Sequence, residues 1–184
     1  LMSSYEKERL PIALRNTDAA RKLTANIGET DIDPAIEHDT SMGEAARRTA
    51  GEMLANFGEQ FASIGVQLGA RYDGSPLIAS EGPAPADSFV TYTPTSVPGG
   101  RAPHLWLDEK RTFGSSLYDQ LGTGFTLLRL GTHTADVSEM LTAAANLGIP
   151  LKVLDIDDMD ARDLYQCDLA LIRPDQHIAW RGNQ

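Results

Sequence analysis

Cys167 is the only cysteine in this 184-residue chain, so any thiol chemistry rests on that residue alone. Disulfide exchange needs an attacking thiol and normally a resolving partner two residues away. In the C-terminal part, Phe113–Leu117 is the segment expected at the start of the helix after the first strand, and its sequence FGSSL holds no cysteine. Cys167 itself falls at the start of a late predicted strand, where a small buried residue is favoured over a peroxidatic thiol. The pattern therefore disfavours a thiol oxidoreductase.

The histidines and the acidic residues raise the question of a metal site. The four histidines fall in four different predicted elements, without the close spacing of a metal-binding pair: His38, His104, His133 and His177. Residues 155–160 read DIDDMD, but they lack the glycine and terminal glutamate of a calcium loop. These carboxylates are better explained as the N-terminal charges of a helix from Asp158 to Tyr165. No metal is expected.

Charge and glycine pattern restrict the ligands further. The formal net charge is −10, and no cluster of lysines and arginines is present, so nucleic acid and anionic membranes are disfavoured as partners. The chain contains neither GxGxxG nor a P-loop, so nothing in it predicts a nucleotide-phosphate site. The charged start, one cysteine and the absence of an apolar run near the roughly 18 residues of a membrane span predict a cytoplasmic protein.

Helices dominate the first part of the chain. Residues 3–26 predict one long helix, bent or restarted at Pro11, and residues 27–40 predict an exposed loop. The sequence SMGE from Ser41 to Glu44 predicts a capping box. Apolar residues at helical spacing then predict a helix with one buried face, formed by Ala46, Ala50, Met53, Leu54, Phe57, Phe61 and Ile64.

The middle of the chain changes character twice. Residues 65–78 predict a strand, a turn at Asp73-Gly74 and a short extended stretch. Residues 81–100 contain four prolines and several glycines, so they predict neither helix nor central strand. We interpret residues 81–102 as a linker between a helical part, residues 1–80, and a C-terminal domain, residues 103–184.

The C-terminal part predicts an α/β fold with a mixed sheet. Strands are expected at residues 103–107, 124–130 and 151–156, with a terminal hairpin from 169–173 and 177–181. Helices are expected at residues 115–121 and 158–165. A further helix is expected to begin after Thr134, its N-cap, and to end at Gly148 and Pro150. Strand, helix, strand and a closing hairpin follow the order of a thioredoxin-like fold.

Several segments resemble one known family. YEKERLPIA from Tyr5 resembles the Y-x-x-E-R-x-P-x-A helix that follows the FAD-binding region in class A flavoprotein aromatic hydroxylases. PGGRAPHLWL from Pro98 resembles the stretch that leads into their C-terminal domain. SLYD from Ser116, GFTLL from Gly124 and LIRPDQHIAWR from Leu171 resemble signatures of that domain.

The resemblance implies FAD and NADPH or NADH as cofactors, and an aromatic substrate such as a phenol, a 3-(3-hydroxyphenyl)propionate or a polyketide, for a longer parent enzyme. It also implies a thioredoxin-like domain that lacks redox cysteines and serves packing and subunit association, so the upstream FAD-binding domain and a second subunit are the expected partners. The family's flavin and catalytic motifs lie upstream of the helix that begins at Tyr5. No catalytic or cofactor-binding residue can therefore be assigned in this chain, and we expect no cofactor to bind it alone.

Three hypotheses follow. The first is the non-catalytic C-terminal portion of a hydroxylase, favoured because the chain starts within a helix motif. The second is a stand-alone module for interaction or dimerisation without redox activity. The third is a divergent thiol peroxidase that uses Cys167, which replacement by serine would test.

Five residues are predicted to have structural roles. Arg101, His104 and Trp106 are expected to join the linker to the terminal domain, and Arg173 and Trp180 to hold the last hairpin. Replacement of Trp106 by alanine would cost about 3 kcal/mol if that side chain is buried.

Overall fold

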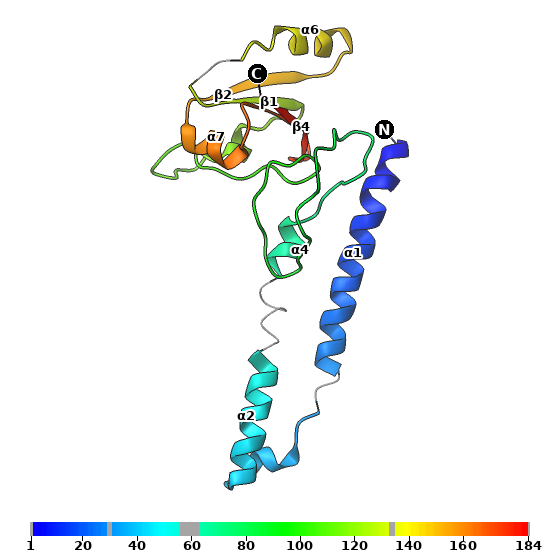
Figure 1. The fold of residues 1–184 in the computed structure, drawn as a ribbon, viewed down its shortest axis with the longest axis vertical. Helices are drawn as coiled ribbons and strands as arrows, with labels where there is room; N and C mark the ends of the chain where they lie inside the picture. The colour runs from blue at the N-terminus through cyan, green and yellow to red at the C-terminus, as the bar shows by residue number, and fades with distance from the viewer. Residues whose placement is uncertain (1, 29–30, 56–62, 133–134, 184) are drawn as a thin grey trace. The chain divides into compact units, whose positions relative to one another are not determined.

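The structure, a computed structural model, describes residues 2–28, 31–55, 63–132 and 135–183 (Figure 1). Two compact units are formed by segments that alternate along the chain. The first unit comprises Leu1–Arg9, Ala70–Ala86 and Thr93–Gln184, and the second comprises Leu10–Gly69 and Asp87–Tyr92. The domain boundaries expected near residues 80 and 102 separate a helical part, a linker and a C-terminal domain, and they stay a prediction. Among the described helices, none combines the length and the hydropathy needed to cross a bilayer.

Helices form most of the described residues before Gly69. Helix α1 (Met2–Gly28) continues through Pro11, and the 3₁₀ helix η1 (Pro34–Glu37) follows it within the exposed stretch expected at residues 27–40. Helix α2 (Ser41–Ala55) starts as expected, but its cap differs from the prediction. Thr40 Oγ1 accepts a hydrogen bond from the Gly43 N–H at 3.2 Å, so the predicted capping box from Ser41 to Glu44 is wrong by one residue at its start.

The predicted apolar face of α2 is only partly buried. Ala50 is buried and Met53 half-buried, whereas the Leu54 side chain is 55% exposed. Phe57 and Phe61 lie outside the described residues. Ile64 opens a short helix, α4 (Ile64–Leu68), where the sequence predicts a strand. The strand prediction fails because Gly65 packs closely against the backbone of residues 88–91, a tertiary contact that overrides local β propensity.

Irregular backbone fills the chain between α4 and the C-terminal sheet. The predicted turn at Asp73-Gly74 is present, with Gly74 at a φ of 76°. Residues 81–100 form neither helix nor strand, which confirms that prediction. The strand predicted at residues 103–107 is wrong, because Trp106 makes only an isolated bridge to Ser116. Pro103 lacks an N–H and cannot donate to a ladder.

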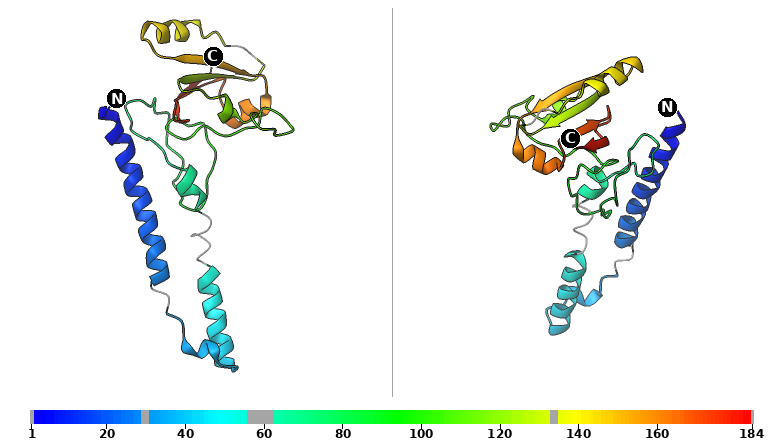
Figure 2. Two further views of the ribbon diagram at one scale, coloured as in Figure 1. Left: turned by 180° about the vertical axis from the view of Figure 1, so that it is seen from behind. Right: turned by 45° about the horizontal axis from the view of Figure 1, so that its top comes forward.

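The C-terminal sheet has four strands in the order β2-β1-β3-β4 (Figure 2). Strands β1 and β2 are parallel, whereas β3 runs antiparallel to both β1 and β4. This order with one antiparallel inner strand is the arrangement expected for a thioredoxin-like α/β domain, and the fold prediction is confirmed. The strands are β1 (Phe125–Leu130), β2 (Leu151–Ile156), β3 (Leu169–Ile172) and β4 (Ile178–Gly182), and the helices are α5 (Leu117–Gln120), α6 (Ser138–Asn146) and α7 (Met159–Tyr165).

Both faces of the sheet are buried, and consecutive residues of β1 show how. Leu127 belongs to a core that includes Val137 and the adjacent α6, whereas Leu128 belongs to a core that includes Tyr165 of α7 and Leu117 of α5. The inner strand β1 is largely buried, whereas Lys152 and Asp155 of the edge strand β2 are exposed. The predictions of both strands are correct. Thr134, the predicted cap of α6, lies outside the described residues.

Candidate functional site

A buried ion pair joins the first turns of α1 to the end of β3. Arg173 Nη1 lies 2.6 Å from Glu8 Oε1, and Arg173 Nη2 lies 3.0 Å from Glu8 Oε2. The Glu8 and Arg173 side chains are only 6% and 11% exposed. Ser75 adds a third bond, because its hydroxyl donates to Glu8 Oε1 at 2.6 Å. The two-point geometry suits a planar guanidinium on a carboxylate and fixes orientation as well as distance.

The surrounding side chains extend this pair into a small network. Arg173 also lies 3.0 Å from Asp175 Oδ2, and the guanidinium groups of Arg9 and Arg173 stand over the Tyr72 ring at 5.2 and 5.1 Å. His177 stacks on Tyr72 with a centroid separation of 4.2 Å. Two carboxylates and two guanidiniums therefore balance one another around one aromatic stack.

The charge state of the ion pair follows from these contacts. The hydrogen bond from Arg173 holds the pKa of the Glu8 carboxyl below its ordinary value, although burial acts in the opposite direction. The same bond raises the pKa of Arg173. Burial raises the pKa of the Tyr72 hydroxyl, so the phenol stays neutral. The Glu8–Arg173 pair is thus an ionised clamp at neutral pH, and neither of its groups is poised for proton transfer.

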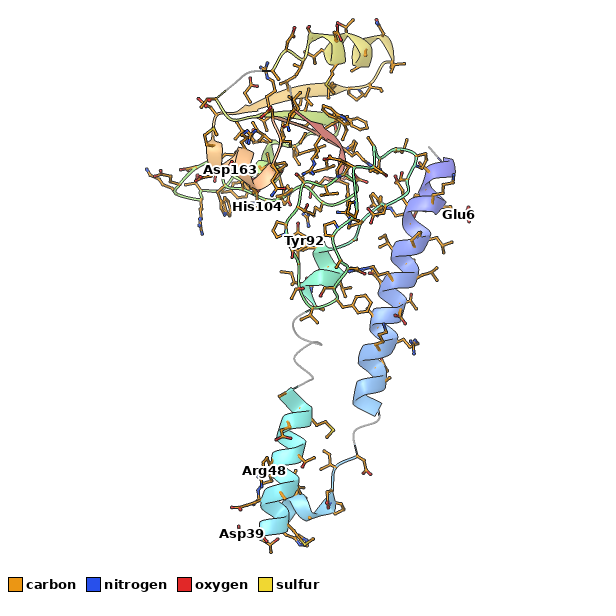
Figure 3. All side chains as sticks on the ribbon, viewed as in Figure 1. Glu6, Asp39, Arg48, Tyr92, His104 and Asp163 are labelled. Atoms are coloured by element: carbon orange, nitrogen blue, oxygen red, sulfur yellow. The ribbon has the colours of Figure 1, made fainter. Side chains whose placement is uncertain are left out.

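Two of the predicted structural residues, Arg101 and His104, contact the Tyr118 ring, and a third, Trp106, contacts His104. The Arg101 guanidinium stands 4.7 Å over the Tyr118 ring and donates to Gln176 Oε1 at 2.8 Å. His104, labelled in Figure 3, is exposed, and its Nε2 lies 3.0 Å from Ser116 Oγ. Trp106 packs edge-on against His104 with centroids 5.0 Å apart.

The exposure of Trp106 changes one expectation. Its side chain is 42% exposed, so the condition for a loss of about 3 kcal/mol is not met. Trp180 lies elsewhere, half-buried against the core of Leu127 and Val137. The structural roles expected for Arg101, His104, Trp106, Arg173 and Trp180 stay predictions, and the contacts of these side chains are compatible with them.

The structure makes thiol chemistry at Cys167 unfavourable. The side chain is 2% exposed, and burial raises its pKa to about 11, so it is neither accessible nor ionised. The segment expected at the start of the helix after the first strand, Phe113–Leu117, does not occupy that place. That helix is α6, which follows β1. The sequence between them, residues 131–137, holds no cysteine either.

The acidic run of residues 155–160 is used within the fold. Asp158 caps α7, as predicted, by accepting from the Asp160 N–H at 2.8 Å. Asp155 pairs with Arg129 Nη2 at 2.8 Å. Within the described parts of the chain, no three histidine, cysteine, aspartate or glutamate side chains gather as a metal site requires. His133 lies outside the described residues.

Residues 95–184 match the family described as aromatic-ring hydroxylase, C-terminal. The FAD-dependent monooxygenase apdD of Emericella nidulans is 29% identical over 98% of the chain and 30% of its own length. Phenol 2-monooxygenase of a Pseudomonas species is 29% identical over 99% of the chain and 35% of its own length.

A solved structure extends the likeness to three dimensions. The rebeccamycin biosynthetic enzyme RebC with reduced flavin is 33% identical and superimposes with a TM-score of 0.85 over 99% of this chain and 33% of RebC. The chain matches the C-terminal part of FAD-dependent aromatic hydroxylases. It spans about a third of the length of these three proteins.

The matched residues 95–184 contain Arg173, whereas its partner Glu8 lies outside them. Sequence reasoning identifies Arg173 but misses Glu8, Tyr72, Ser75 and Asp175. A signal for Glu8 is available, because both members of the ion pair lie in segments that carry the family resemblance. The oppositely charged residues of two separate motifs are a reason to test them as partners.

Proposed function

We propose that this chain is the non-catalytic C-terminal part of an FAD-dependent, NAD(P)H-using monooxygenase that hydroxylates a phenolic or polyketide substrate. The observation that carries the proposal is the buried Glu8–Arg173 pair. By resemblance, α1 is the helix that follows the FAD-binding region. The pair anchors the start of this helix to the thioredoxin-like domain, so its role would be to fix the position of the polypeptide as it leaves the flavin-binding region.

The described residues of β1–α6–β2 do not fit a flavin site. In β1–α6–β2, where a dinucleotide would meet the start of a helix, the loop offers only one glycine, Gly131. The Asp136 carboxylate already accepts from the Ser138 N–H at 2.9 Å. A negative side chain thus occupies the helix start where a pyrophosphate would bind, and would repel it. The flavin, the nicotinamide cofactor and the aromatic substrate are therefore assigned to the upstream region of a longer parent enzyme.

A flavin titration of the isolated chain is the first test. We expect no change in FAD fluorescence or in the visible absorption band at any chain concentration. The control is free FAD with serum albumin at matched concentration, which corrects for nonspecific effects. Tight binding would contradict the proposal and would require assay of this chain as a complete enzyme.

The second test uses the longer reading frame that contains this chain. We expect the purified product to retain FAD and to oxidise NADPH or NADH faster with a phenol, giving a product heavier by one oxygen atom. In the same protein, Arg173→Met should weaken FAD retention, whereas Arg9→Met, which removes an exposed arginine, should not. A longer product without bound flavin would overturn the proposed function.

A further inference from the structure

A groove of about 500 Å³, which we call the acidic groove, lies between α7 and the loop of residues 107–111 beside it (Figure 1). Trp106, Leu107 and Leu164 are 42%, 39% and 36% exposed, so the groove keeps apolar surface in contact with solvent. The apolar part of its lining consists of Leu105, Trp106, Leu107, Ala161 and Leu164.

Carboxylates border the acidic groove on both sides. Asp108 and Glu109 lie on the loop side, and Asp158 and Asp160 lie at the start of α7. Among the described lining residues, Arg111 is the only cation. The groove therefore presents an apolar wall between two acidic banks.

Two of these carboxylates are used within the fold, and two are not. Asp108 accepts from the Thr112 hydroxyl at 2.8 Å, and Asp158 caps α7. Within the part of the chain that the structure describes, the Glu109 and Asp160 carboxylates have no hydrogen-bond or ion-pair partner. One unpaired carboxylate on each bank is thus available to a ligand.

The charge of the acidic groove restricts its occupant to cations. An anionic ligand would be repelled. A second copy of the chain would bring a formal net charge of −10 without a cluster of lysines and arginines, so like charges would oppose its approach. The described histidine, cysteine, aspartate and glutamate side chains form no group of three that could hold a metal ion. An organic cation that also carries apolar surface matches both features of the groove.

The open wall favours a peptide over a small molecule. A small-ligand site typically encloses roughly 70–90% of its ligand, whereas Trp106 and Leu164 remain partly exposed along this groove. Lysine and arginine have long apolar stems, which can lie over such a wall while their charged ends reach an acidic bank. Leucine or an aromatic residue next to them would supply the remaining apolar contact.

We propose that the acidic groove binds a basic segment of a partner protein, in which lysine or arginine alternates with leucine or an aromatic residue. The apolar side chains of the segment pack against Trp106 and Leu164, and its cations pair with Glu109 and Asp160. The Trp106 indole can also receive a cation over its face. This inference goes beyond the proposed function and does not depend on it.

The complex would be weak and sensitive to salt. Exposed ion pairs contribute little and are screened by added ions. The open wall covers one side of the segment, so we expect a dissociation constant on the order of 100 µM at low ionic strength.

Fluorescence anisotropy of a labelled peptide with the full chain tests the chemistry of the partner. The probe has seven residues and alternates lysine with leucine. Peptides that alternate lysine with serine, or glutamate with leucine, should bind more weakly by about fivefold or more, because each lacks one of the two features that the groove recognises. Absence of binding, or equal binding of either control peptide, would overturn the proposal.

A pair of charge-neutral variants tests the place of binding. Glu109→Gln combined with Asp160→Asn should raise the dissociation constant of the lysine–leucine peptide about threefold or more at low ionic strength. The matched control combines Asp157→Asn with Asp163→Asn, which removes two exposed carboxylates outside the groove; Asp163 is labelled in Figure 3. Equal weakening in the two double variants would mean general attraction to an acidic chain and would contradict the proposal. If the first double variant does not fold, Glu109→Gln alone, on the exposed loop, decides.

Sedimentation velocity with and without the lysine–leucine peptide tests a second copy as the occupant. We expect the peptide to bind without changing the association state of the chain. A dimer that the peptide dissociates would show that a second copy covers the acidic groove, and it would overturn the proposal.

Discussion

The carboxylate of Glu8 and the guanidinium of Arg173 form a two-point ion pair across 165 residues of sequence. One member lies on the first helix and the other directly after the third strand of the sheet. Both side chains are nearly buried, so neither can exchange its partner for water. This relationship ties the start of α1 to the thioredoxin-like domain and is the basis of the first two predictions.

Replacement of Arg173 by methionine should destabilise the chain by about 3–5 kcal/mol, because it leaves the buried Glu8 carboxylate without its cation. Urea unfolding followed by circular dichroism measures the change. Arg9→Met is the matched control: the Arg9 side chain is 48% exposed and lies 4.0 Å from Asp175, so its loss should cost under about 1 kcal/mol. Glu8→Gln combined with Arg173→Met should recover part of the loss. Equal effects of the two single arginine substitutions would contradict a special role for the pair.

The same pair predicts how stability depends on pH. The pKa of Glu8 is lower in the folded chain than its ordinary value of 4.5, so the unfolded chain takes up a proton first as the pH falls. The contribution of Glu8 to the free energy of unfolding is therefore complete at pH values above its ordinary pKa. It is lost as the pH falls through the lowered pKa that Glu8 has in the folded chain. Urea midpoints measured from neutral to acidic pH should fall less steeply in Glu8→Gln than in the unchanged chain. Parallel curves would show that Glu8 carries none of the acid sensitivity.

The thiol of Cys167 should not react in the folded protein. With a pKa of about 11, roughly one thiol in a thousand is ionised at pH 8, and the side chain is also buried. A chromogenic disulfide reagent should label the chain only after unfolding in urea, which serves as the positive control. Rapid labelling under native conditions would reopen the peroxidatic hypothesis.

Gly65 should tolerate no side chain. A Cβ at this position would overlap the carbonyl oxygen of Ser88, a backbone atom that cannot move aside cheaply. Gly65→Ala should therefore cost roughly 1–3 kcal/mol through overpacking. Gly51, inside α2, has nothing within 4 Å of the corresponding position, so Gly51→Ala should raise stability by up to about 1 kcal/mol. Thermal melting of the two variants should shift in opposite directions.

Trp106→Ala should lower the free energy of unfolding by about 1 kcal/mol, because 42% of the side chain already faces solvent. This loss is smaller than the loss expected when a buried tryptophan is replaced. The matched comparison is Trp180→Ala, which removes a side chain packed against the second core of the sheet and should cost more. Urea midpoints give both values. A larger loss for Trp106 would mean that its contacts with His104 matter more than its exposure suggests.

Elements whose signals are local can be predicted from the sequence alone. The apolar runs of residues 124–130 and 151–156 and the cap at Asp158 each depend on neighbours within a few positions, so the predictions of β1, β2 and the start of α7 are correct. The same reasoning fails for residues 65–68, where packing against distant backbone determines the structure. It also fails for Pro103–Leu107, where Pro103 lacks the N–H that a strand would use.

Tertiary packing determines which distant residues meet. The segments of Glu8 and Arg173 both carry the family resemblance, but the contacts of Glu8 with Arg173 and Ser75 depend on how the sheet and the start of α1 pack. Burial follows the same rule for Trp106, which is expected to be packed but is 42% exposed, whereas the burial predicted for Cys167 is confirmed. Hydrophobic pattern specifies that a residue can be buried, but the sum of long-range contacts specifies whether it is, because burial is a property of the assembled surface rather than of the local chain.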